Sequence, residues 1–567
     1  MAELTPRMKE LVQPYLAGIE PYDPNFTPTR INLSANENTY PVPAGVREAV
    51  DAALAATPLN RYPDPMSNDL RDELAAWHGV TRENICVGNG GDELLYNYLL
   101  AFGGAGRTLL NCPPCFSEYA FFASLCQTEV RDVWRDPATF ELDQAAVLAA
   151  APECDLAIVT SPNNPTGDVA PLDFVAALCD ACPGMVMVDE AYVEFADDSF
   201  GAATTAQGLI AEHPNLVILH TLSKAFGAAG TRLGYVIAAP EVIDVFAAIR
   251  QIYSVNVLSQ ATALACVRAR DAYTPVVAQV ASERERELCA LRAMAAEGMP
   301  VEAWPSAANF ALVRTPHATR VRERLRDEYS ILVRDFSYAP GLADCLRITV
   351  GTPRENDEVL AAFAALVKEE MQMGRYAEVT RKTGETDIVV KLDLDGTGTC
   401  DISTGVPFFD HMLNAFGRHG LFDLTVHAVG DVEVDAHHTV EDVGIVLGEA
   451  FCQALGDKAG ITRFADAAIA MDETLVMAAV DISGRGQAYC ELPVPTERVG
   501  SFDTELAVEF FYAFARDAKL TLHVRELAGG NSHHIIEAAF KAVGRTMRRA
   551  CELDPRVQGI PSTKGSL

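Results

Sequence analysis

The sequence predicts two domains in one chain: an α/β domain with a mostly parallel sheet, then an α+β domain that contains a duplicated strand–helix unit. Three observations lead to this prediction. At 567 residues the chain is too long for a single hydrophobic core. Before about residue 372, apolar runs typical of strands alternate with amphipathic stretches. After it, strands and helices alternate again, and the pattern His-His-x-x-Glu occurs twice.

In the first domain, short apolar runs predict strands at 155–160, 185–189, 216–220 and 234–238. An amphipathic segment at 172–182 predicts a helix between the first two. The segment 357–370 predicts the helix that closes this domain. No spacer rich in Pro, Gly or Ser follows it, so we expect a short linker between domains at 1–371 and 374–567.

In the second domain, strands are predicted at 387–394, 424–428, 474–482 and 520–525, and the helices between them carry the two histidine pairs. The chain has 12 histidines, and eight of them follow residue 400. On a helix, residues three or four apart share a face, whereas adjacent residues diverge by roughly 100°. Each pair therefore spreads its ligands in two directions, and two copies predict two metal sites. The alternative is two helices with ordinary polar faces.

Composition excludes several classes of partner. A net charge of −33 disfavours nucleic acid and anionic membrane surfaces. No apolar stretch reaches the roughly 18 residues of a membrane span, and the N-terminus lacks the apolar core of a signal peptide. The 14 cysteines are scattered, which predicts reduced thiols in a cytoplasmic protein. Cys112–Cys115 and Cys179–Cys182 could form a zinc or redox set, but they fall in a predicted turn and at a predicted helix end.

Lysine is scarce in the first domain, where residues 1–367 contain only Lys9 and Lys224. Lys224 directly follows a predicted strand and is followed by small residues. This setting is typical of a lysine that forms a Schiff base, which needs a desolvated amine near a sheet edge. Ser223 and Arg232 lie close enough along the chain to bind a phosphate beside it.

Three other strand ends carry suitable polar groups. Asp189 can pair with a pyridinium nitrogen and keep the ring protonated as an electron sink. Asn164 lies in a turn after another predicted strand. A glycine turn at 88–92 opens a helix, where backbone N–H groups can hold a phosphate. A plain turn explains that stretch equally well by itself, but four such elements at successive strand ends indicate a cofactor site.

Residues 1 to about 370 resemble the fold-type I pyridoxal phosphate aminotransferases, most closely histidinol-phosphate aminotransferase. That fold has a large parallel-sheet domain and a small α/β domain. The motifs that carry the resemblance are LSANEN (33–38), RYPD (61–64), GNGGDEL (88–94), SPNNPTG (161–167), VDEAYVEF (188–195), TLSKAFGAAGTRLGY (221–235) and CLRITVGTP (345–353).

The resemblance implies a role for each matching residue. Lys224 would bind the cofactor and transfer the substrate proton, and Asp189 would hold the pyridine nitrogen. The phosphate would be bound by Gly91, Asp92, Ser223 and Arg232, the 3′-oxygen by Tyr192 and Asn164, and the ring would stack on Phe116. Cys115 stands where the family usually has threonine.

Other residues are implied in substrate binding and in assembly. Tyr62 would reach the cofactor phosphate of a neighbouring subunit, which implies a dimer. Arg347 would clamp the substrate carboxylate or the equivalent phosphate. Arg334, Asn309 and Tyr22 are further candidates for this pocket; for Arg334 and Tyr22 the alternative is a surface or packing role.

Residues 374–567 resemble imidazoleglycerol-phosphate dehydratase over its whole length. The motifs are RKTGETDI (381–388), LDGTGTCDISTGVPFFDHML (394–413), HGLFDL (419–424), DAHHTVEDVGIVLG (435–448), GITRFA (460–465), DISGRG (481–486), LHVRELAGGNSHHIIEAAFKA (522–542) and PSTKG (561–565). The resemblance implies two manganese ions held by His411, His437, His438, Glu441, His523, His533, His534 and Glu537. The donor types suit zinc or iron as well, so only the resemblance selects manganese.

Five further positions match substrate-binding residues of that family: Glu385, Arg463, Arg485, Ser562 and Lys564. His419 and His427 match no ligand and are interpreted as structural. Asp393 and Asp395 imitate the nucleophile loop of a haloacid-dehalogenase-type phosphatase. Because the dehydratase motifs begin at once, at residue 403, we interpret this stretch as a strand and a tight turn.

Together the resemblances imply two consecutive steps of histidine biosynthesis. Imidazole glycerol phosphate would be dehydrated to imidazole acetol phosphate, with Glu385, Glu441 and Glu537 as unassigned acid and base candidates. Transamination with glutamate would then give histidinol phosphate and 2-oxoglutarate. The aminotransferase family forms dimers and the dehydratase family forms cages, so the two resemblances imply a large homo-oligomer. One alternative is an aminotransferase of other specificity, or a related phosphothreonine decarboxylase, that is fused to a metal-binding domain. Another is a metal-storage protein.

Overall fold

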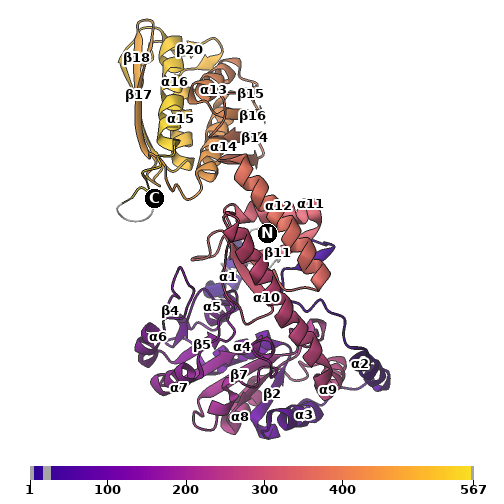
Figure 1. Cartoon of the computed structure of the whole chain (residues 1–567). Helices are drawn as coiled ribbons and strands as arrows, with labels where there is room; N and C mark the ends of the chain where they lie inside the picture. The colour runs from indigo at the N-terminus through magenta and orange to yellow at the C-terminus, as the bar shows by residue number, and fades with distance from the viewer. Residues whose placement is uncertain (1–5, 17–26, 558, 563–567) are drawn as a thin grey trace. The chain divides into compact units, whose positions relative to one another are not determined.

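The structure is a computed structural model that describes residues 6–16, 27–557 and 559–562. The chain divides into two compact units, Met1–Lys368 (unit 1) and Glu369–Leu567 (unit 2) (Figure 1). The division falls inside helix α12 (Pro353–Met373), where the sequence predicts the closing helix of the first domain. In the described part of the chain, no helix combines the length and apolarity needed to cross a membrane.

Unit 1 contains a seven-stranded sheet in which β8 runs antiparallel to both of its neighbours and the other paired strands are parallel. The four strands predicted from apolar runs all belong to it, each within one residue of its predicted bounds. The order is β2 (Ile85–Gly88), β8 (Gly234–Ala238), β7 (Leu216–Thr221), β6 (Met185–Asp189), β5 (Leu156–Thr160), β3 (Thr108–Asn111) and β4 (Glu129–Asp132).

Both faces of this sheet are buried, because successive residues of a strand point to opposite faces. Along β6, Val186 and Val188 pack on one face and Met187 on the other. One face is covered by α3 (Asn68–His78), α6 (Gln144–Ala150), α7 (Leu172–Ala181), α9 (Val257–Arg268) and the start of α10 (Thr274–Ala296). The other is covered by α4 (Gly91–Phe102), α5 (Glu118–Leu125) and α8 (Pro240–Ile249). The predicted helix at 172–182 is α7.

A second sheet in unit 1 has five strands and carries two of the predicted substrate residues, Arg334 and Arg347. Its order is β1 (Ile31–Leu33), β11 (Ile331–Asp335), β12 (Cys345–Thr349), β10 (Phe310–Arg314) and β9 (Glu302–Ala303). Helices α10, α11 (Ala318–Tyr329) and α12 share its hydrophobic core. The remaining helices of unit 1 are α1 (Pro6–Leu11) and α2 (Ala44–Ala56).

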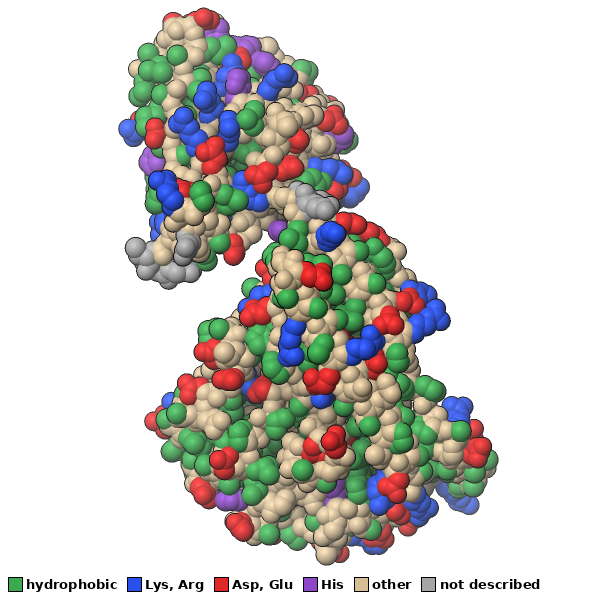
Figure 2. Space-filling view, in the orientation of Figure 1, with side chains coloured by type: hydrophobic (Ala, Val, Ile, Leu, Met, Phe, Trp, Pro, Cys, Tyr) green, Lys and Arg blue, Asp and Glu red, His purple; other side chains and the backbone are tan. Residues whose placement is uncertain are grey.

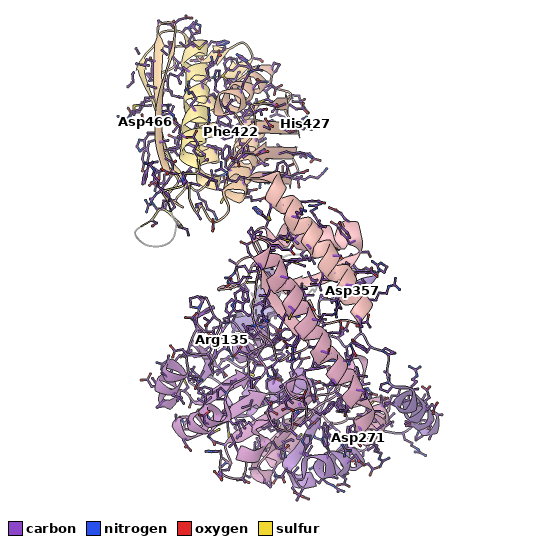
Figure 3. The ribbon with its side chains drawn as sticks, in the orientation of Figure 1. Arg135, Asp271, Asp357, Phe422, His427 and Asp466 are labelled. Carbon is purple, nitrogen blue, oxygen red and sulfur yellow. The ribbon has the colours of Figure 1, made fainter. Side chains whose placement is uncertain are left out.

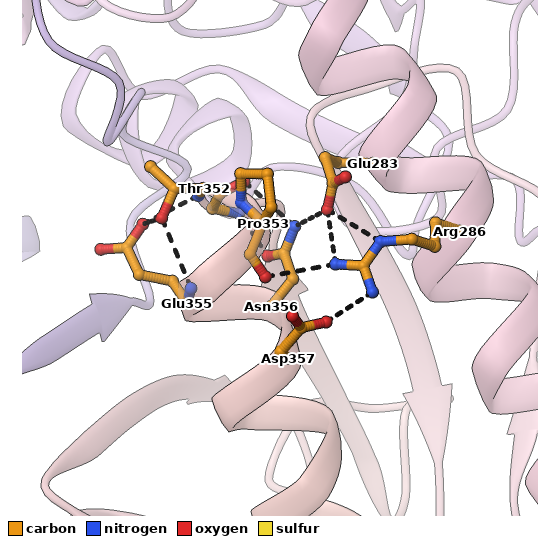
Figure 4. Close-up of polar contacts among 8 residues, drawn as sticks. Glu283, Arg286, Thr352, Pro353, Glu355, Asn356 and Asp357 are labelled. Atoms are coloured by element: carbon orange, nitrogen blue, oxygen red, sulfur yellow. Dashed lines mark hydrogen bonds and ion pairs between the residues drawn. The ribbon is translucent and has the colours of Figure 1, made fainter.

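A hydrogen-bond network fixes the corner between β12 and α12 (Figure 4). The Thr352 hydroxyl accepts from the Glu355 backbone N–H at 3.4 Å, and the Glu355 carboxylate accepts from the Thr352 backbone N–H at 2.8 Å. This reciprocal pair is a capping box. Glu283 on α10 accepts from Arg286 at 2.6 Å and from Asn356 at 3.0 Å. The corner that follows the Arg347 strand is therefore tied to the long helix α10.

Buried polar side chains hold the loops of unit 1 as well. Arg135, labelled in Figure 3, pairs with Asp168 at 2.6 Å and donates to the carbonyls of Cys112 and Phe140 at 3.2 and 3.3 Å. Its side chain is 1% exposed, so the charge is compensated inside the protein. On the face shown in Figure 2, basic and acidic side chains are interspersed on both units.

Unit 2 places four helices between two four-stranded sheets (Figure 1). The first sheet is β13 (Tyr376–Lys382), β14 (Thr386–Asp393), β16 (Asp423–Gly430) and β15 (Cys400–Ser403). The second is β17 (Phe464–Met471), β18 (Thr474–Asp481), β22 (Thr521–Ala528) and β19 (Gln487–Glu491). A short hairpin, β20 (Arg498–Val499) and β21 (Phe502–Asp503), lies apart from both.

The two sheets have the same connectivity, which confirms the predicted internal duplication. In each, an antiparallel hairpin is followed by a strand that pairs in parallel with the last strand of the repeat. The helices also correspond: α13 (Pro407–Gly420) and α14 (His437–Leu455) in the first repeat, α15 (Leu506–Asp517) and α16 (Ser532–Cys551) in the second.

The core of unit 2 lies between helices that approach closely. Phe422 belongs to this core and is fully buried, whereas His427 on β16 is exposed and lies outside the core (Figure 3). A Cβ at Gly544 of α16 would lie 2.4 Å from the carbonyl oxygen of Phe416 on α13. Only glycine allows this contact, because any side chain there would overlap the neighbouring backbone.

Candidate active sites

The carboxyl ends of β5, β6 and β7 meet at one edge of the large sheet, and a predicted cofactor residue lies at or just beyond each. Asp189 ends β6, Asn164 follows β5 and Lys224 follows β7. All three line one pocket with a volume of about 1010 Å³. Open α/β sheets bind ligands at this edge, because connections diverge there and leave a crevice.

Most of the other predicted residues line the same pocket. They are Gly91, Asp92, Phe116, Tyr192, Ser223, Arg232, Arg334 and Arg347. Tyr62 does not: it is 81% exposed and stacks on Tyr253 at 4.6 Å between ring centroids. Asn309 is buried outside the lining and donates to the carbonyl of Asn36 at 3.0 Å. Tyr22 falls outside the described residues.

Lys224 is the reactive amine of the pocket. Its Nζ donates to the carbonyl of Ala35 at 2.9 Å and lies 5.8 Å from the centre of the Tyr192 ring. Burial, followed by the positive charge of Arg347, lowers the pKa of Lys224 to about 8. A neutral amine is the form that attacks a carbonyl, so the lowered pKa increases the fraction of the reactive form near neutral pH.

The Asp189 carboxylate is held by two donors. The Tyr119 hydroxyl donates to its Oδ2 at 2.7 Å, and the Ala191 backbone N–H donates to its Oδ1 at 3.0 Å. Burial raises the pKa of Asp189 to about 6, and the hydrogen bond from Tyr119 opposes that rise. Tyr119 is 1% exposed and was not predicted, because no local pattern indicates that its hydroxyl reaches a strand end 70 residues away.

One end of the pocket is lined by arginines. Arg347 donates to the Asn164 side chain at 2.5 Å and to the Ser34 carbonyl at 2.7 Å. Arg334 lines the pocket from β11, and Arg322 lines it from α11. Arg322 was not predicted, since its helix carries several other arginines at similar spacing. Arginine is well suited to bind carboxylate or phosphate groups.

A second anion-binding corner lies at the start of α4. Arg232 contacts Asp92 at 2.7 Å, and the Ser223 hydroxyl lies 2.9 Å from that of Thr221. Gly90 has a φ of +86°, and a Cβ there would lie 2.6 Å from the Arg232 guanidinium. The glycine turn therefore lets the arginine approach the helix N-terminus, where backbone N–H groups favour phosphate.

The residues of this pocket fit pyridoxal phosphate. They supply an amine on one strand end, a carboxylate on the next, an aromatic ring and a cationic phosphate corner. The arginines at the other end add groups for an anionic substrate.

In unit 2 the histidine pairs occupy the first turns of α14 and α16. The rings of His437 and His438 lie 6.3 Å apart at 87°, and those of His533 and His534 lie 6.2 Å apart at 81°. Adjacent histidines thus point in different directions, as the helical geometry predicts. Several histidine side chains gather on the surface of unit 2 in Figure 2.

One cluster joins three of the predicted metal ligands. Glu537 Oε2 lies 3.0 Å from His533 Nε2 and 3.6 Å from His411 Nε2, and all three ligand atoms lie within 4.8 Å of one another. Imidazole and carboxylate at these separations can hold a divalent transition metal. Burial alone would raise the pKa of Glu537, but Lys541 and the histidines outweigh it and the pKa is lowered. The carboxylate is therefore ionised and ready to bind a cation.

The other predicted ligands lie elsewhere on the same chain. His437 is 3.9 Å from Glu441, His438 contacts Asp431, and His523 stacks on Tyr489. His534 forms a second cluster with Asp472 and Glu473. Within the described residues of one chain, the eight predicted ligands do not converge on a single point.

The predicted substrate residues of unit 2 are spread around these clusters. Arg463 pairs with Asp481 at 2.8 Å and lies over the Phe464 ring, and Arg485 is exposed. Glu385 is exposed next to His438. Ser562 is half-buried, and Lys564 falls outside the described residues. Asp395, of the phosphatase-like stretch, is ion-paired with Arg375 in a turn after β14, so it is engaged in a structural contact.

Comparisons with known proteins divide the chain in the same way. The model of the aminotransferase class I and II family matches residues 28–363, and that of imidazoleglycerol-phosphate dehydratase matches residues 404–547. The dehydratase of Thermoanaerobacter sp. (strain X514) is 61% identical over 193 residues, which are 34% of this chain and 100% of that protein. The dehydratase of Synechococcus sp. (strain CC9902) is 58% identical over 194 residues, 34% of this chain and 96% of that protein.

Solved structures resemble unit 1. Histidinol-phosphate aminotransferase from Sinorhizobium meliloti, in complex with pyridoxal-5′-phosphate, has a TM-score of 0.58 and 25% identity, covering 63% of this chain and 98% of that chain. L-threonine-O-3-phosphate decarboxylase from Porphyromonas gingivalis has a TM-score of 0.52 and 25% identity, covering 60% of this chain and 99% of that one.

Proposed function

The chain belongs to the aminotransferase class I and II family in unit 1 and to the imidazoleglycerol-phosphate dehydratase family in unit 2, and from this we propose a bifunctional enzyme of histidine biosynthesis. Unit 2 dehydrates imidazole glycerol phosphate to imidazole acetol phosphate. Unit 1 transfers an amino group from glutamate to that ketone and forms histidinol phosphate and 2-oxoglutarate. One observation supports this assignment above the others: a single chain matches both families, whose reactions are consecutive, since the product of the dehydration is the ketone that is transaminated.

In unit 1, bound pyridoxal phosphate supplies an electron sink for the transamination. The protein's own groups do the rest. Lys224 provides the amine and then moves a proton at the substrate α-carbon, and Asp189 holds the pyridine nitrogen. Arg347, with Arg334 and Arg322, binds the carboxylate of glutamate or the phosphate of the other substrate. The two substrates share an anionic group at this end, so one set of arginines serves both half-reactions.

In unit 2, a bound divalent metal would supply a Lewis acid that acidifies the N–H of the imidazole ring, and loss of that proton leaves the ring electron-rich. The histidines and two of the glutamates hold the metal, and Arg463 and Arg485 bind the substrate phosphate. Loss of the hydroxyl needs an acid at the leaving oxygen and a base at the neighbouring C–H. Glu385, Glu441 and Glu537 are the candidates for the acid and the base.

We propose further that the metal is manganese and that the protein forms a large cytoplasmic homo-oligomer. Support for the assembly comes from the predicted ligands, of which only His411, His533 and Glu537 share one cluster within the described residues of a chain, so a neighbouring subunit would complete each site. Tyr62 is exposed on unit 1, as a residue that contacts a partner's cofactor would be before assembly. A light-scattering mass near one dimer would contradict the assembly.

A second candidate function for unit 1 is decarboxylation of L-threonine-O-3-phosphate, because a decarboxylase with that substrate has a similar structure. Carbon dioxide released from this compound by the purified protein, without transamination of imidazole acetol phosphate, would favour it. Histidinol phosphate formed from the ketone and glutamate would favour the aminotransferase.

The main test is a coupled assay that starts from imidazole glycerol phosphate and glutamate and follows histidinol phosphate. Lys224→Ala should stop at the ketone, whereas His438→Ala should leave the starting material unchanged. His427→Ala is the matched control, since it removes an exposed histidine of the same unit that pairs only with Asp401. Full conversion by Lys224→Ala would refute the assignment of the amine, and full conversion by His438→Ala would refute that of the metal site.

A further inference from the structure

The first turns of α14 and α16 in unit 2 correspond with an offset of 96 positions. This offset relates His438 to His534 and Asp435 to Asn531. Asp435 and Asn531 each accept a hydrogen bond from the backbone N–H of the first histidine of their helix, at 2.8 and 2.9 Å. The helices α14 and α16 therefore begin in the same way, and the groups around their second histidines can be compared position by position.

The hairpins that face these helices also correspond. The β13–β14 turn ends in Glu385, and the β17–β18 turn ends in Glu473. Each glutamate directly precedes the first residue of the next strand, Thr386 or Thr474, and both threonines are buried. Glu473 is thus the counterpart of Glu385 in the second repeat, although no sequence motif predicts it.

The two glutamates differ in how closely they approach the second histidine. Glu473 Oε2 lies 3.1 Å from His534 Nδ1, whereas Glu385 Oε2 lies 3.7 Å from His438 Nδ1. In the first repeat Asp431 takes the close position instead, at 3.1 Å from His438 Nδ1. The second repeat has no such aspartate, because the residues that follow β22 are Gly529, Gly530 and Asn531.

We propose that Glu473 is a positioning residue that holds the Nδ1–H of His534 so that Nε2 faces the metal. A carboxylate partner on one ring nitrogen fixes the tautomer and the orientation of a metal-binding histidine. Asp431 does the same for His438, and this leaves Glu385 free to act on the substrate. The same role thus falls to different residues in the two repeats, Asp431 in the first and Glu473 in the second.

Two further contacts support this role. The Asn531 backbone N–H donates to Glu473 Oε1 at 3.1 Å, which anchors the carboxylate to the start of α16. The Nε2 of His534 lies 3.9 Å from Asp472, beyond hydrogen-bond distance, so it stays available for an ion. The inference rests on the proposed metal-dependent function of unit 2.

The test titrates metal-free, full-length protein with Mn²⁺ against a competing chelating indicator. Glu473→Ala should bind one class of ion about 10- to 100-fold more weakly, the usual effect of losing such a partner. Glu473→Gln should keep most of the affinity, because the amide oxygen still accepts from Nδ1–H. Glu385→Gln should bind Mn²⁺ normally but lose dehydration. Glu491→Gln, which removes an exposed carboxylate paired with Arg525, is the control and should match the wild type in Mn²⁺ affinity and in dehydration.

The proposal is overturned if Glu473→Ala binds Mn²⁺ as tightly as the wild type and loses only turnover, since Glu473 would then act on the substrate. It is also overturned if Glu385→Gln loses the same class of ion. A wild-type protein that binds no Mn²⁺ and still dehydrates the substrate would instead refute the metal-dependent function itself. Circular dichroism of each variant verifies that unit 2 is folded.

Discussion

Tyr119 offers the sharpest test of how the structure prepares the cofactor pocket. Its hydroxyl donates to Asp189 at 2.7 Å, and both side chains are buried. Tyr119→Phe keeps the aromatic ring but removes this donor, together with the 2.7 Å hydrogen bond to the Thr160 hydroxyl. A hydrogen bond to a charged group contributes about 1.5–3 kcal/mol, and one pKa unit corresponds to about 1.4 kcal/mol. The pKa of Asp189, which burial raises to about 6, should therefore rise by roughly one to two further units.

This shift has a consequence that depends on pH. The carboxylate holds the pyridine nitrogen only when it is ionised, so the variant must first remove a proton that the wild type has already lost. At pH 7 we expect the affinity for pyridoxal phosphate to fall by about 2- to 10-fold. The loss should grow as pH falls and vanish well above the shifted pKa, where Asp189 is ionised in both proteins.

The measurement is a titration of cofactor-free protein with pyridoxal phosphate at a series of pH values, followed by the visible absorbance of the bound cofactor. Tyr98→Phe is the matched control: Tyr98 is equally buried, but its hydroxyl donates to the carbonyls of Met185 and Ala157. It should lower stability without changing cofactor affinity. Equal affinity of Tyr119→Phe and wild type at all pH values, or a loss that is independent of pH, would refute the reasoning.

Three other predictions concern ionisation and packing. Burial and Arg347 lower the pKa of Lys224 to about 8, so cofactor binding by the apoprotein, followed by stopped-flow absorbance, should accelerate as pH rises through that value. Arg347→Met should move the midpoint of this pH dependence upward. An unmoved midpoint would exclude an effect of Arg347 on the pKa of Lys224. Burial raises the pKa of Glu287 well above its ordinary value of 4.5. The folded protein therefore loses stability as pH rises above 4.5, because the unfolded chain releases a proton that the folded protein keeps. Glu287→Met should raise the unfolding free energy measured in denaturant titrations, and the gain should increase with pH. Gly544→Ala should destabilise unit 2 by about 1–3 kcal/mol because its Cβ would overlap Phe416. Gly45→Ala, which adds a Cβ in open space on α2, should instead raise stability by about 0.5–1 kcal/mol. Calorimetry that finds the same effect for both variants would contradict the packing argument.

The sequence predicts the elements of both units well, because the patterns on which they depend are local. Strands β5 to β8 are continuous apolar runs buried on both faces, and such runs stand out without any knowledge of their neighbours. The duplicated His-His-x-x-Glu pattern predicts two equivalent helices, and α14 and α16 both begin with it. Lys224 stands out because lysine is otherwise nearly absent from unit 1.

Other parts of the sites could not be predicted, since they depend on contacts between distant residues. Tyr119 reaches Asp189 only because α5 packs on the face of the sheet where Ile158 and Met187 are buried. Arg322 lines the pocket because α11 packs beside β11, yet its sequence context is that of any charged helix. Tyr62, from the RYPD motif, and Asn309, a further candidate for the substrate pocket, lie outside the pocket lining of a single chain.

The sequence by itself determined the chemistry of this protein: an isolated lysine after a strand, a carboxylate at the next strand end, and two sets of histidines at helical spacing. Residue types and short-range spacing are enough for this, because reactivity belongs to side chains and periodicity to local backbone geometry. Only the tertiary structure decided which of these groups meet, as with His411 and His533, and which carboxylate supports which histidine, as with Asp431 and Glu473. Those pairings arise from packing across many intervening residues, and no local pattern encodes such a distance.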